Sequence, residues 1–157
     1  MIVSEPNGAR RLAAERVGAD LIIDPASEDV VERVLEATDG RGADVVVEAV
    51  GSVRTYEDAL RMVRPAGRLL AFGAAPAEAE IALRPFEIFA KELTIMGSYA
   101  GTYETWPEAI DLLASGRFDP GIIIDTVRPL EEAAEAIESL EQDKSVVKVL
   151  LKVGDES

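Results

Sequence analysis

The chain has 157 residues, 48% of them hydrophobic, contains no Cys and no His, and carries a net charge of −14 at pH 7. The length suffices for one domain with a hydrophobic core, and no apolar run approaches the roughly 20 residues that span a bilayer. The two missing residue types exclude disulfides, Cys or His metal ligands and His-based catalysis within this chain. The acidic charge argues against nucleic-acid binding and is interpreted as a solubilising surface or as adaptation to high salt. With no basic region followed by an apolar stretch at the start, we expect a cytoplasmic protein without a signal peptide.

The first part of the chain alternates short apolar runs with stretches whose apolar residues recur at helical spacing. Turn residues such as Gly18 and the pair Asp39-Gly40 separate them. In chain order, we predict a strand at Met1–Ser4, a helix at Gly8–Val17, a strand at Leu21–Ile23, a helix capped by Ser27 with Val30, Val31, Val34 and Leu35 on its buried face, and a strand at Asp44–Ala49. The last of these, DVVVEA, is largely apolar, as a strand buried on both faces should be.

The same alternation continues to the end of the chain. We predict, in order, a helix at Tyr56–Val63 stopped by Pro65 and Gly67, a strand at Arg68–Phe72, a helix at Pro85–Ala90, a strand at Leu93–Met96, a helix at Glu104–Ser115, a strand at Ile122–Val127, a helix at Leu130–Leu140 and a strand at Val146–Val153. This repetition predicts an α/β fold with a mostly parallel sheet and helices on both faces. Binding sites in such sheets lie at the carboxyl ends of the strands.

Glu5 is the first candidate site residue, because it ends an apolar strand and opens a loop into a helix. In dinucleotide-binding folds, an acid at this place accepts hydrogen bonds from the adenosine ribose and repels a 2′-phosphate, which favours NAD over NADP. The alternative is a surface acid stabilised by the helix N-terminus. A glycine-rich turn about 20 residues upstream would decide between them, but the chain begins at this strand.

Four other glycines follow apolar runs: Gly51, Gly73, Gly97 and Gly101. None forms the G-x-G-x-x-G pattern. Each is either a plain turn glycine or a place where the backbone must approach a flat ligand closely. Finding several at strand ends favours the second interpretation.

Four segments together resemble the zinc-type medium-chain alcohol and polyol dehydrogenases, a group that includes threonine and sorbitol dehydrogenases. They are VSEPNGARRLAAERVGAD, TDGRGADVVVEAVGS, ALRMVRPAGRLLAFG and ELTIMGSYAGTYETWPEAIDLLASGRFD. The resemblance extends from Met1 to about Val153 and argues against another Rossmann-like binder such as a methyltransferase. It implies the carboxyl-terminal, cofactor-binding part of such an enzyme.

The resemblance implies cofactor roles for several residues. Glu5 falls at the ribose-binding acid, where Asp is more common; Arg10 falls beside the adenosine; Ala49, Val50 and Gly51 fall along the cofactor; Phe72, Gly73 and Ala74 face the nicotinamide carboxamide; Ser98, Tyr99 and Ala100 lie on its other side; and Lys148 reaches the pyrophosphate. The alternative for Lys148 is a solvated charge on a strand.

The chain departs from the family because it has neither the first Rossmann strand with its glycine-rich turn nor the catalytic domain that holds zinc in the relatives. We therefore expect a single truncated dinucleotide-binding domain, with a Rossmann part at residues 1–118 and a strand–helix–strand part at residues 119–153 that normally packs on the catalytic domain. No zinc or other metal ligands and no catalytic residue are expected here. Tyr99 and Tyr103 are candidate acids, but packing or surface roles fit them better.

The missing strand belongs at the centre of the sheet. Unpaired buried backbone is unfavourable, so the sheet should close up, rearrange or borrow a strand. The last two strands either pair with each other or stay exposed, and homo-oligomers are expected through sheet edges, above all through Leu93–Met96.

Two hypotheses about function follow. The chain is either the NAD-binding portion of an oxidoreductase, not active alone, or a non-enzymatic binding or oligomerisation module that no longer binds nucleotide.

Overall fold

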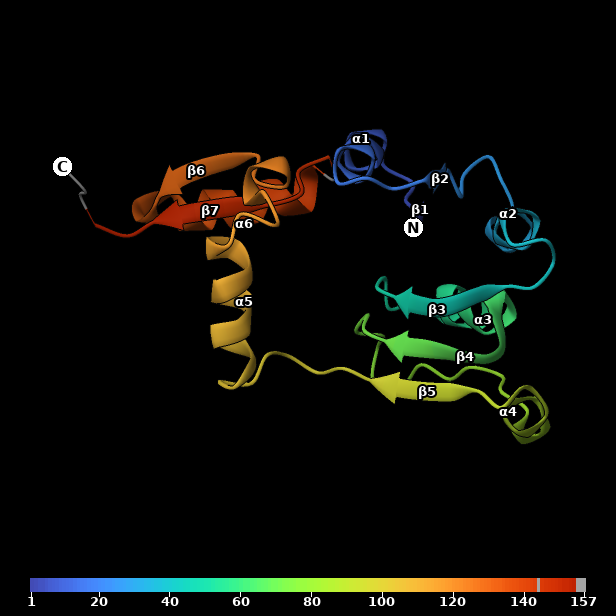
Figure 1. Cartoon of the computed structure of the whole chain (residues 1–157). Helices are drawn as coiled ribbons and strands as arrows, with labels where there is room; N and C mark the ends of the chain where they lie inside the picture. The colour runs from blue at the N-terminus through green and yellow to red at the C-terminus, as the bar shows by residue number, and fades with distance from the viewer. Residues whose placement is uncertain (144, 155–157) are drawn as a thin grey trace. The chain divides into compact units, whose positions relative to one another are not determined.

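A computed structural model of the chain describes residues 1–143 and 145–154. The strands are β1 (Ile2–Ser4), β2 (Leu21–Ile23), β3 (Ala43–Glu48), β4 (Val63–Ala71), β5 (Thr94–Gly97), β6 (Thr126–Pro129) and β7 (Val149–Lys152). The α-helices are α1 (Gly8–Arg16), α2 (Val30–Ala37), α3 (Val53–Met62), α4 (Pro85–Lys91), α5 (Thr105–Ala114) and α6 (Ala133–Gln142), joined by two 3₁₀ helices, η1 (Pro120–Ile122) and η2 (Leu130–Glu132). Figure 1 shows these elements along the chain.

The chain forms two compact units, and the predicted α/β class with parallel strands is confirmed in both. One unit comprises Met1–Ala26 and the chain from Gly101 onward, and the other comprises Ser27–Ala100. The first contains two parallel strand pairs, β1–β2 and β6–β7, and the second contains a parallel three-stranded sheet in the order β3–β4–β5. β1 and β3 belong to separate sheets, so the sheet is not closed by direct pairing of these two strands.

The core of the Ser27–Ala100 unit forms where α3 packs on β3 and β4. Ala59 and Leu60 from α3 meet Leu69 from β4, and all three are at most 7% exposed. The alternate residues Val45 and Val47 point away from this core and are 47% and 54% exposed. The expectation that this strand is buried on both faces is therefore wrong for the described structure, because α3 covers only the face that alternation gives to the other residues.

The connection between α3 and β4 differs from the one predicted from the sequence. The helix ends at Met62, and β4 begins at once, with Pro65 and Gly67 inside the strand. The pairing with β3 shifts between Ala43 and Val45, so Pro65 and Gly67 lie in an irregular stretch where the ladder is interrupted. Such irregular positions tolerate a residue that lacks an N–H and one that lacks a side chain.

Two helix starts also differ from the prediction. Asp29, not Ser27, caps α2, because its carboxylate accepts a hydrogen bond from the Glu32 N–H at 2.9 Å. α3 begins at Val53 instead of Tyr56, because Ser52 and Thr55 form a reciprocal capping box. Both caps satisfy N–H groups that the helix itself leaves unpaired.

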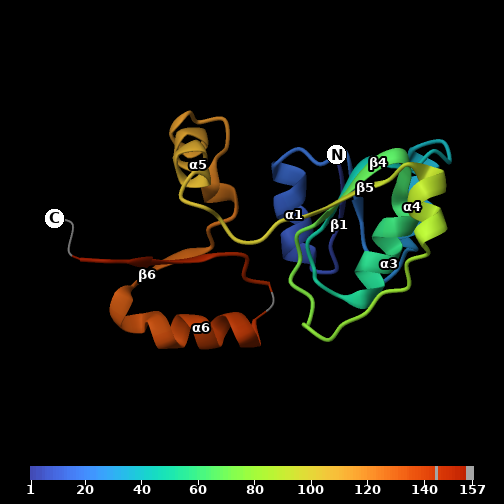
Figure 2. The same cartoon turned by 90° about the horizontal axis from the view of Figure 1, so that it is seen from below.

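The last part of the chain is a parallel β6–β7 pair with α6 packed along it (Figure 2). This confirms that the two final strands pair with each other. The predicted strand at Ile122–Val127 is wrong at its start, because residues 120–122 form η1, with Asp119 accepting from the Gly121 N–H at 2.9 Å. The final strand is shorter than predicted because the Asp125 carboxylate binds the N–H groups of Val147 and Lys148 before β7 begins.

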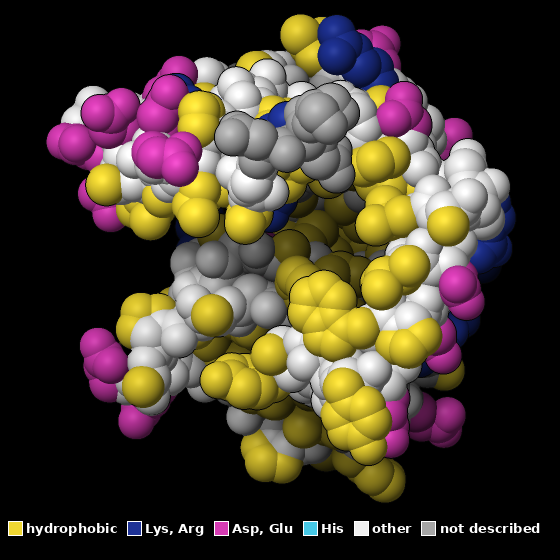
Figure 3. All heavy atoms as spheres, turned by 90° about the vertical axis from the view of Figure 1, so that its left-hand side faces the viewer, with side chains coloured by type: hydrophobic (Ala, Val, Ile, Leu, Met, Phe, Trp, Pro, Cys, Tyr) yellow, Lys and Arg dark blue, Asp and Glu magenta, His cyan; other side chains and the backbone are white. Residues whose placement is uncertain are grey.

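Hydrophobic side chains are widely exposed in this structure, as the face drawn in Figure 3 shows. α5 is the clearest example: Trp106 and Ile110, one helical turn apart, are 61% and 60% exposed. No α5 residue is buried. Its predicted amphipathic pattern is present, but the apolar face has no cover within the described residues.

Candidate functional site

The strands of the three-stranded sheet bring three of the predicted segments to one edge. β3, β4 and β5 are parallel neighbours, so their carboxyl ends lie at the same side of the sheet. Residues 49–51, 72–74 and 98–100 directly follow these ends. The Ser98 N–H donates to the carbonyl of Ala71 at 3.0 Å, which ties the third segment to the end of β4.

The first two segments are in direct contact through their glycines. A Cβ on Gly51, whose φ is +81°, would lie 2.4 Å from the carbonyl oxygen of Ala74. A Cβ on Gly73 would lie 2.3 Å from the amide nitrogen of Gly51. Both glycines are therefore required by the packing of one turn on the other. At Gly97, by contrast, a Cβ would meet nothing within 4 Å, so there is open space beside the end of β5.

Glu48, the last residue of β3, is a site residue that the sequence prediction missed. Its side chain is buried, and Oε1 accepts hydrogen bonds from the N–H groups of Val50 and Gly51, each at 2.9 Å. The Thr55 hydroxyl donates to the same oxygen at 2.8 Å. The signal that could have found it is an acid at the carboxyl end of a Val-rich strand, since a buried carboxylate needs donors close by.

Tyr56 stands next to this carboxylate and contacts the second turn. Its hydroxyl donates to the carbonyl of Gly73 at 2.7 Å. Burial raises the pKa of the Tyr56 hydroxyl, and the nearby negative charge of Glu48 raises it further. The phenol therefore stays protonated at neutral pH and keeps its role as a donor.

Glu5 lies at the end of β1, in the other unit. Its Oε1 accepts a hydrogen bond from the Asn7 N–H at 2.8 Å, just before α1 begins. This is the arrangement expected of an acid at a helix N-terminus. A carboxylate has a second oxygen, so the bond to Asn7 is compatible with a further hydrogen bond to a ligand.

Arg10 and the stretch that contains Lys148 lie together within that same unit. Nη2 of Arg10 donates to the carbonyl of Val146 at 3.2 Å, while its Nε is buried without a hydrogen-bond partner among the described residues. Lys148 is exposed, and its backbone pairs with Asp125: its N–H donates to the carboxylate and its carbonyl accepts from the Asp125 N–H.

Exposed apolar side chains stand at each of the three strand-end segments. Val50 is 69% exposed, Phe72 59% and Tyr99 96%. Exposed aliphatic and aromatic side chains of this kind are able to pack against a planar ring system. Tyr103 is also 83% exposed, so both candidate tyrosines lie at the surface.

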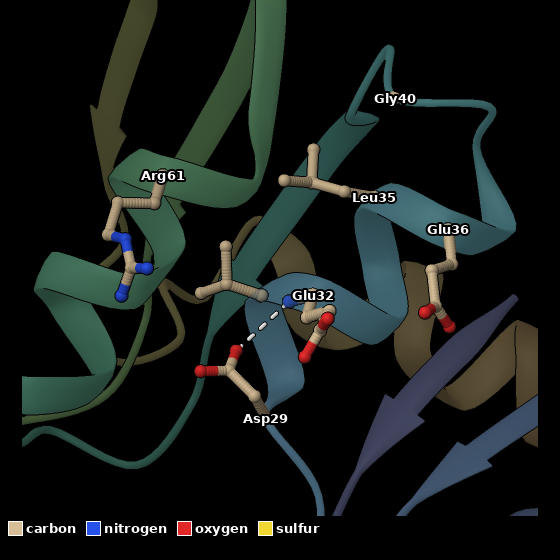
Figure 4. Close-up of a pocket in the computed structure, with 7 residues that line it drawn as sticks. Asp29, Glu32, Leu35, Glu36, Gly40 and Arg61 are labelled. Carbon is tan, nitrogen blue, oxygen red and sulfur yellow. Dashed lines mark hydrogen bonds between the residues drawn. The ribbon is translucent and has the colours of Figure 1, made fainter.

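A separate pocket of about 530 Å³ lies between α2 and α3 and contains none of the predicted site residues (Figure 4). Asp29, Glu32 and Glu36 contribute three acids to its lining, and Arg61 from α3 contributes one cation. The excess of acids disfavours a pyrophosphate there. The strand-end edge remains the better candidate for a nucleotide.

The described residues contain no group of three or more acidic residues placed to hold a metal ion, and the chain has no His or Cys. Within the same residues, no helix combines the length and the apolar character needed to cross a membrane.

Comparison with known proteins shows that the chain is similar to dehydrogenases. Residues 1–115 match the family model described as zinc-binding dehydrogenase. An L-threonine 3-dehydrogenase of Pyrococcus horikoshii is 40% identical over 148 residues, which cover 92% of this chain and 42% of that enzyme.

Two solved structures have the same fold. An Escherichia coli oxidoreductase of unknown specificity involved in membrane biogenesis superposes with a TM-score of 0.87 at 28% identity, covering 98% of this chain and 44% of that one. A Sinorhizobium meliloti protein, described as a zinc-binding dehydrogenase and bound to NADP, superposes with a TM-score of 0.80 at 30% identity, covering 87% and 40%. The predicted Rossmann-like fold is thereby confirmed, and the chain spans less than half the length of each of these three relatives.

Proposed function

The chain belongs to the zinc-binding dehydrogenase family, and from this premise we propose that it forms part of the nicotinamide dinucleotide site of an oxidoreductase. The observation that carries the proposal is the edge of the three-stranded sheet, where segments 49–51, 72–74 and 98–100 follow neighbouring parallel strands. Ligands of open α/β sheets bind at such an edge. The open space beside Gly97 and the exposed side chains of Val50 and Phe72 fit a flat ring there.

The roles proposed for individual residues divide between the two ends of the cofactor. The three strand-end segments receive the nicotinamide end. The residues of the other unit bind the rest: Glu5 accepts from the adenosine ribose, Arg10 packs beside the adenosine and Lys148 reaches the pyrophosphate.

Glu5 is also proposed to select NAD over NADP, because its carboxylate repels a 2′-phosphate. The Sinorhizobium meliloti relative is bound to NADP, so titration with both nucleotides distinguishes the two preferences. Calorimetric titration of the purified chain should give a lower dissociation constant for NAD than for NADP. Glu5→Ala should bring the dissociation constants of NAD and NADP closer together. Glu15→Ala removes the same charge from an exposed position on α1 and should leave the ratio of the two constants unchanged. An equal affinity for both nucleotides in the unaltered chain would contradict the proposed selectivity.

We propose that the chain alone transfers no hydride. Hydride transfer needs the oxygen of the reacting carbon to be polarised, and a zinc ion supplies that when bound in the resembling enzymes. This chain offers neither Cys nor His to hold zinc, and its carboxylates suit harder cations. Reduction of NAD by the isolated chain in the presence of L-threonine or another alcohol would contradict this.

The second candidate function, a binding or oligomerisation module without nucleotide, is favoured by exposed apolar residues on β5. In the described part of the chain β5 pairs only with β4, and Ile95 and Met96 are 40% and 53% exposed. An edge strand with such residues pairs readily with a second copy. Sedimentation of the purified chain should show dimers that Ile95→Lys disrupts, and a monomer at all concentrations would contradict association. Failure to bind either nucleotide, together with dimers, would favour this module over the cofactor site.

A further inference from the structure

Glu48 places a carboxyl group where solvent has almost no access. Its side chain is 3% exposed, and it forms no ion pair with Lys or Arg in the described part of the chain. Burial of an unpaired carboxylate is strongly unfavourable unless hydrogen-bond donors compensate for the lost water. The donors here are the N–H groups of Val50 and Gly51 and the Thr55 hydroxyl, and the Gly51 N–H also approaches Oε2 at 3.2 Å.

The same residue also holds the turn that follows β4. The backbone carbonyl of Glu48 accepts from the N–H groups of Phe72 at 3.0 Å and Gly73 at 2.7 Å. The Tyr56 hydroxyl donates to the Gly73 carbonyl of the same turn. A Cβ on Gly73 would lie 2.6 Å from Oε2 of Glu48, so the second turn sits directly against the carboxylate.

Helix capping does not explain why a carboxylate is needed. Ser52 and Thr55 already form the capping box that starts α3. What the carboxylate adds is a partner for the Val50 and Gly51 N–H groups, which turns them toward the protein interior. The Val50 side chain then faces outward and is 69% exposed.

We propose that Glu48 and Tyr56 are positioning residues, which fix segments 49–51 and 72–74 in the geometry that receives the nicotinamide end of the cofactor. The inference rests on the proposed function and deepens it. Neither residue is expected to touch the reacting atoms, since the Glu48 oxygens are buried and engaged. Functional geometry needs an accuracy of about 0.5 Å, and a second layer of hydrogen bonds commonly supplies it.

The test separates the two ends of the cofactor. ADP-ribose keeps the adenosine, both phosphates and the second ribose of NAD but lacks the nicotinamide. Calorimetric titrations of NAD and of ADP-ribose are compared for the unaltered chain, Glu48→Gln and Tyr56→Phe, with Glu57→Gln at an exposed position of α3 as the control. Glu48→Gln presents an amide NH₂ to the Gly51 N–H, and Tyr56→Phe removes the hydroxyl that donates to the Gly73 carbonyl and lies near Glu48.

We expect Glu48→Gln to weaken NAD binding about tenfold and Tyr56→Phe several-fold, as for loss of one charged and one neutral hydrogen bond. ADP-ribose binding should be unchanged in both variants, and the control should change neither. Equal weakening of NAD and ADP-ribose, or no weakening of NAD, would overturn the positioning role while leaving the proposed cofactor site intact. Should Glu48→Gln lose its circular dichroism signal, Tyr56→Phe decides alone, and loss of fold in both would also overturn the role. An unaltered chain that binds neither ligand would overturn the proposed function itself, and this inference with it.

Discussion

The two units hold their proposed ligand contacts in different ways. In the Ser27–Ala100 unit, the strand-end turns are fixed by backbone hydrogen bonds and by the buried Glu48 carboxylate. In the other unit, the candidates are side chains on a loop, a helix and an exposed stretch: Glu5, Arg10 and Lys148. Turns held by a buried network are ordered before a ligand arrives, whereas an exposed side chain such as Lys148 loses conformational freedom when it binds one. The nicotinamide end of the proposed site is therefore the more preorganised end.

The Ser27–Ala100 unit also contains more of the buried side chains than the other unit does. Apart from Ile23 and Ala136, the buried hydrophobic side chains of the described residues lie in the Ser27–Ala100 unit, among them Leu60 and Leu69.

The largest expected effect is on the core of the Ser27–Ala100 unit. Leu60→Ala should lower the free energy of unfolding by about 2–5 kcal/mol, because it removes buried methyl groups and leaves a cavity. Ile137→Ala on α6, where the side chain is 62% exposed, should change it by less than about 0.5 kcal/mol. Urea denaturation followed by far-ultraviolet circular dichroism measures both, since the single Trp106 lies outside the Ser27–Ala100 unit. Similar losses in the two variants would contradict the contrast in packing.

The next largest expected effect concerns the contact between segments 49–51 and 72–74. Gly51→Ala should destabilise the chain by about 1–3 kcal/mol from its positive φ alone, and the clash with Ala74 adds to this. Gly97→Ala is the matched control, since its Cβ enters open space. The difference between the melting temperatures of the two variants measures how much the contact between the turns contributes to stability. Equal melting temperatures would contradict the described packing of the turns.

The smallest expected effect is on the pH at which the Tyr56 hydroxyl ionises. The pKa of Tyr56 is raised above the ordinary tyrosine value of 10.0 by burial and by Glu48. Its contribution to stability is therefore fully present below about pH 10 and is lost as the pH rises through the folded-state pKa. The absorbance of ionised tyrosine should contain one late-titrating contribution, and Tyr56→Phe should remove it. A titration curve whose high-pH part is the same in Tyr56→Phe as in the unaltered chain would contradict this environment.

Most of the fold could be predicted from the sequence because the alternation of apolar runs and helical periodicity is strong. The errors lie where a local hydrogen bond overrides the pattern. Ile122 belongs to a 3₁₀ helix because Asp119 caps it, and α2 begins at Val30 because the Asp29 carboxylate reaches the Glu32 N–H. Propensity does not distinguish these choices, since Ser and Asp are both good caps.

The candidate site was predictable only in part. The strand-end turns followed from the rule that sites lie at the carboxyl ends of parallel strands, and the structure brings them together. Gly51 and Gly73 were expected to make room for a ligand, but the space is taken by the neighbouring turn. Glu48 was missed because hydrogen bonds from a later helix and from its own turn are not visible in the spacing of residues.

The most direct test of the central claim is a titration of the isotopically labelled chain with NAD, followed by the amide signals in nuclear magnetic resonance. The account predicts that the signals of residues 49–51, 72–74 and 98–100 shift together along one binding curve, while those of α6 stay in place. Shifts spread evenly over the chain, or confined to the acidic pocket between α2 and α3, would contradict a nicotinamide site at the edge of the three-stranded sheet.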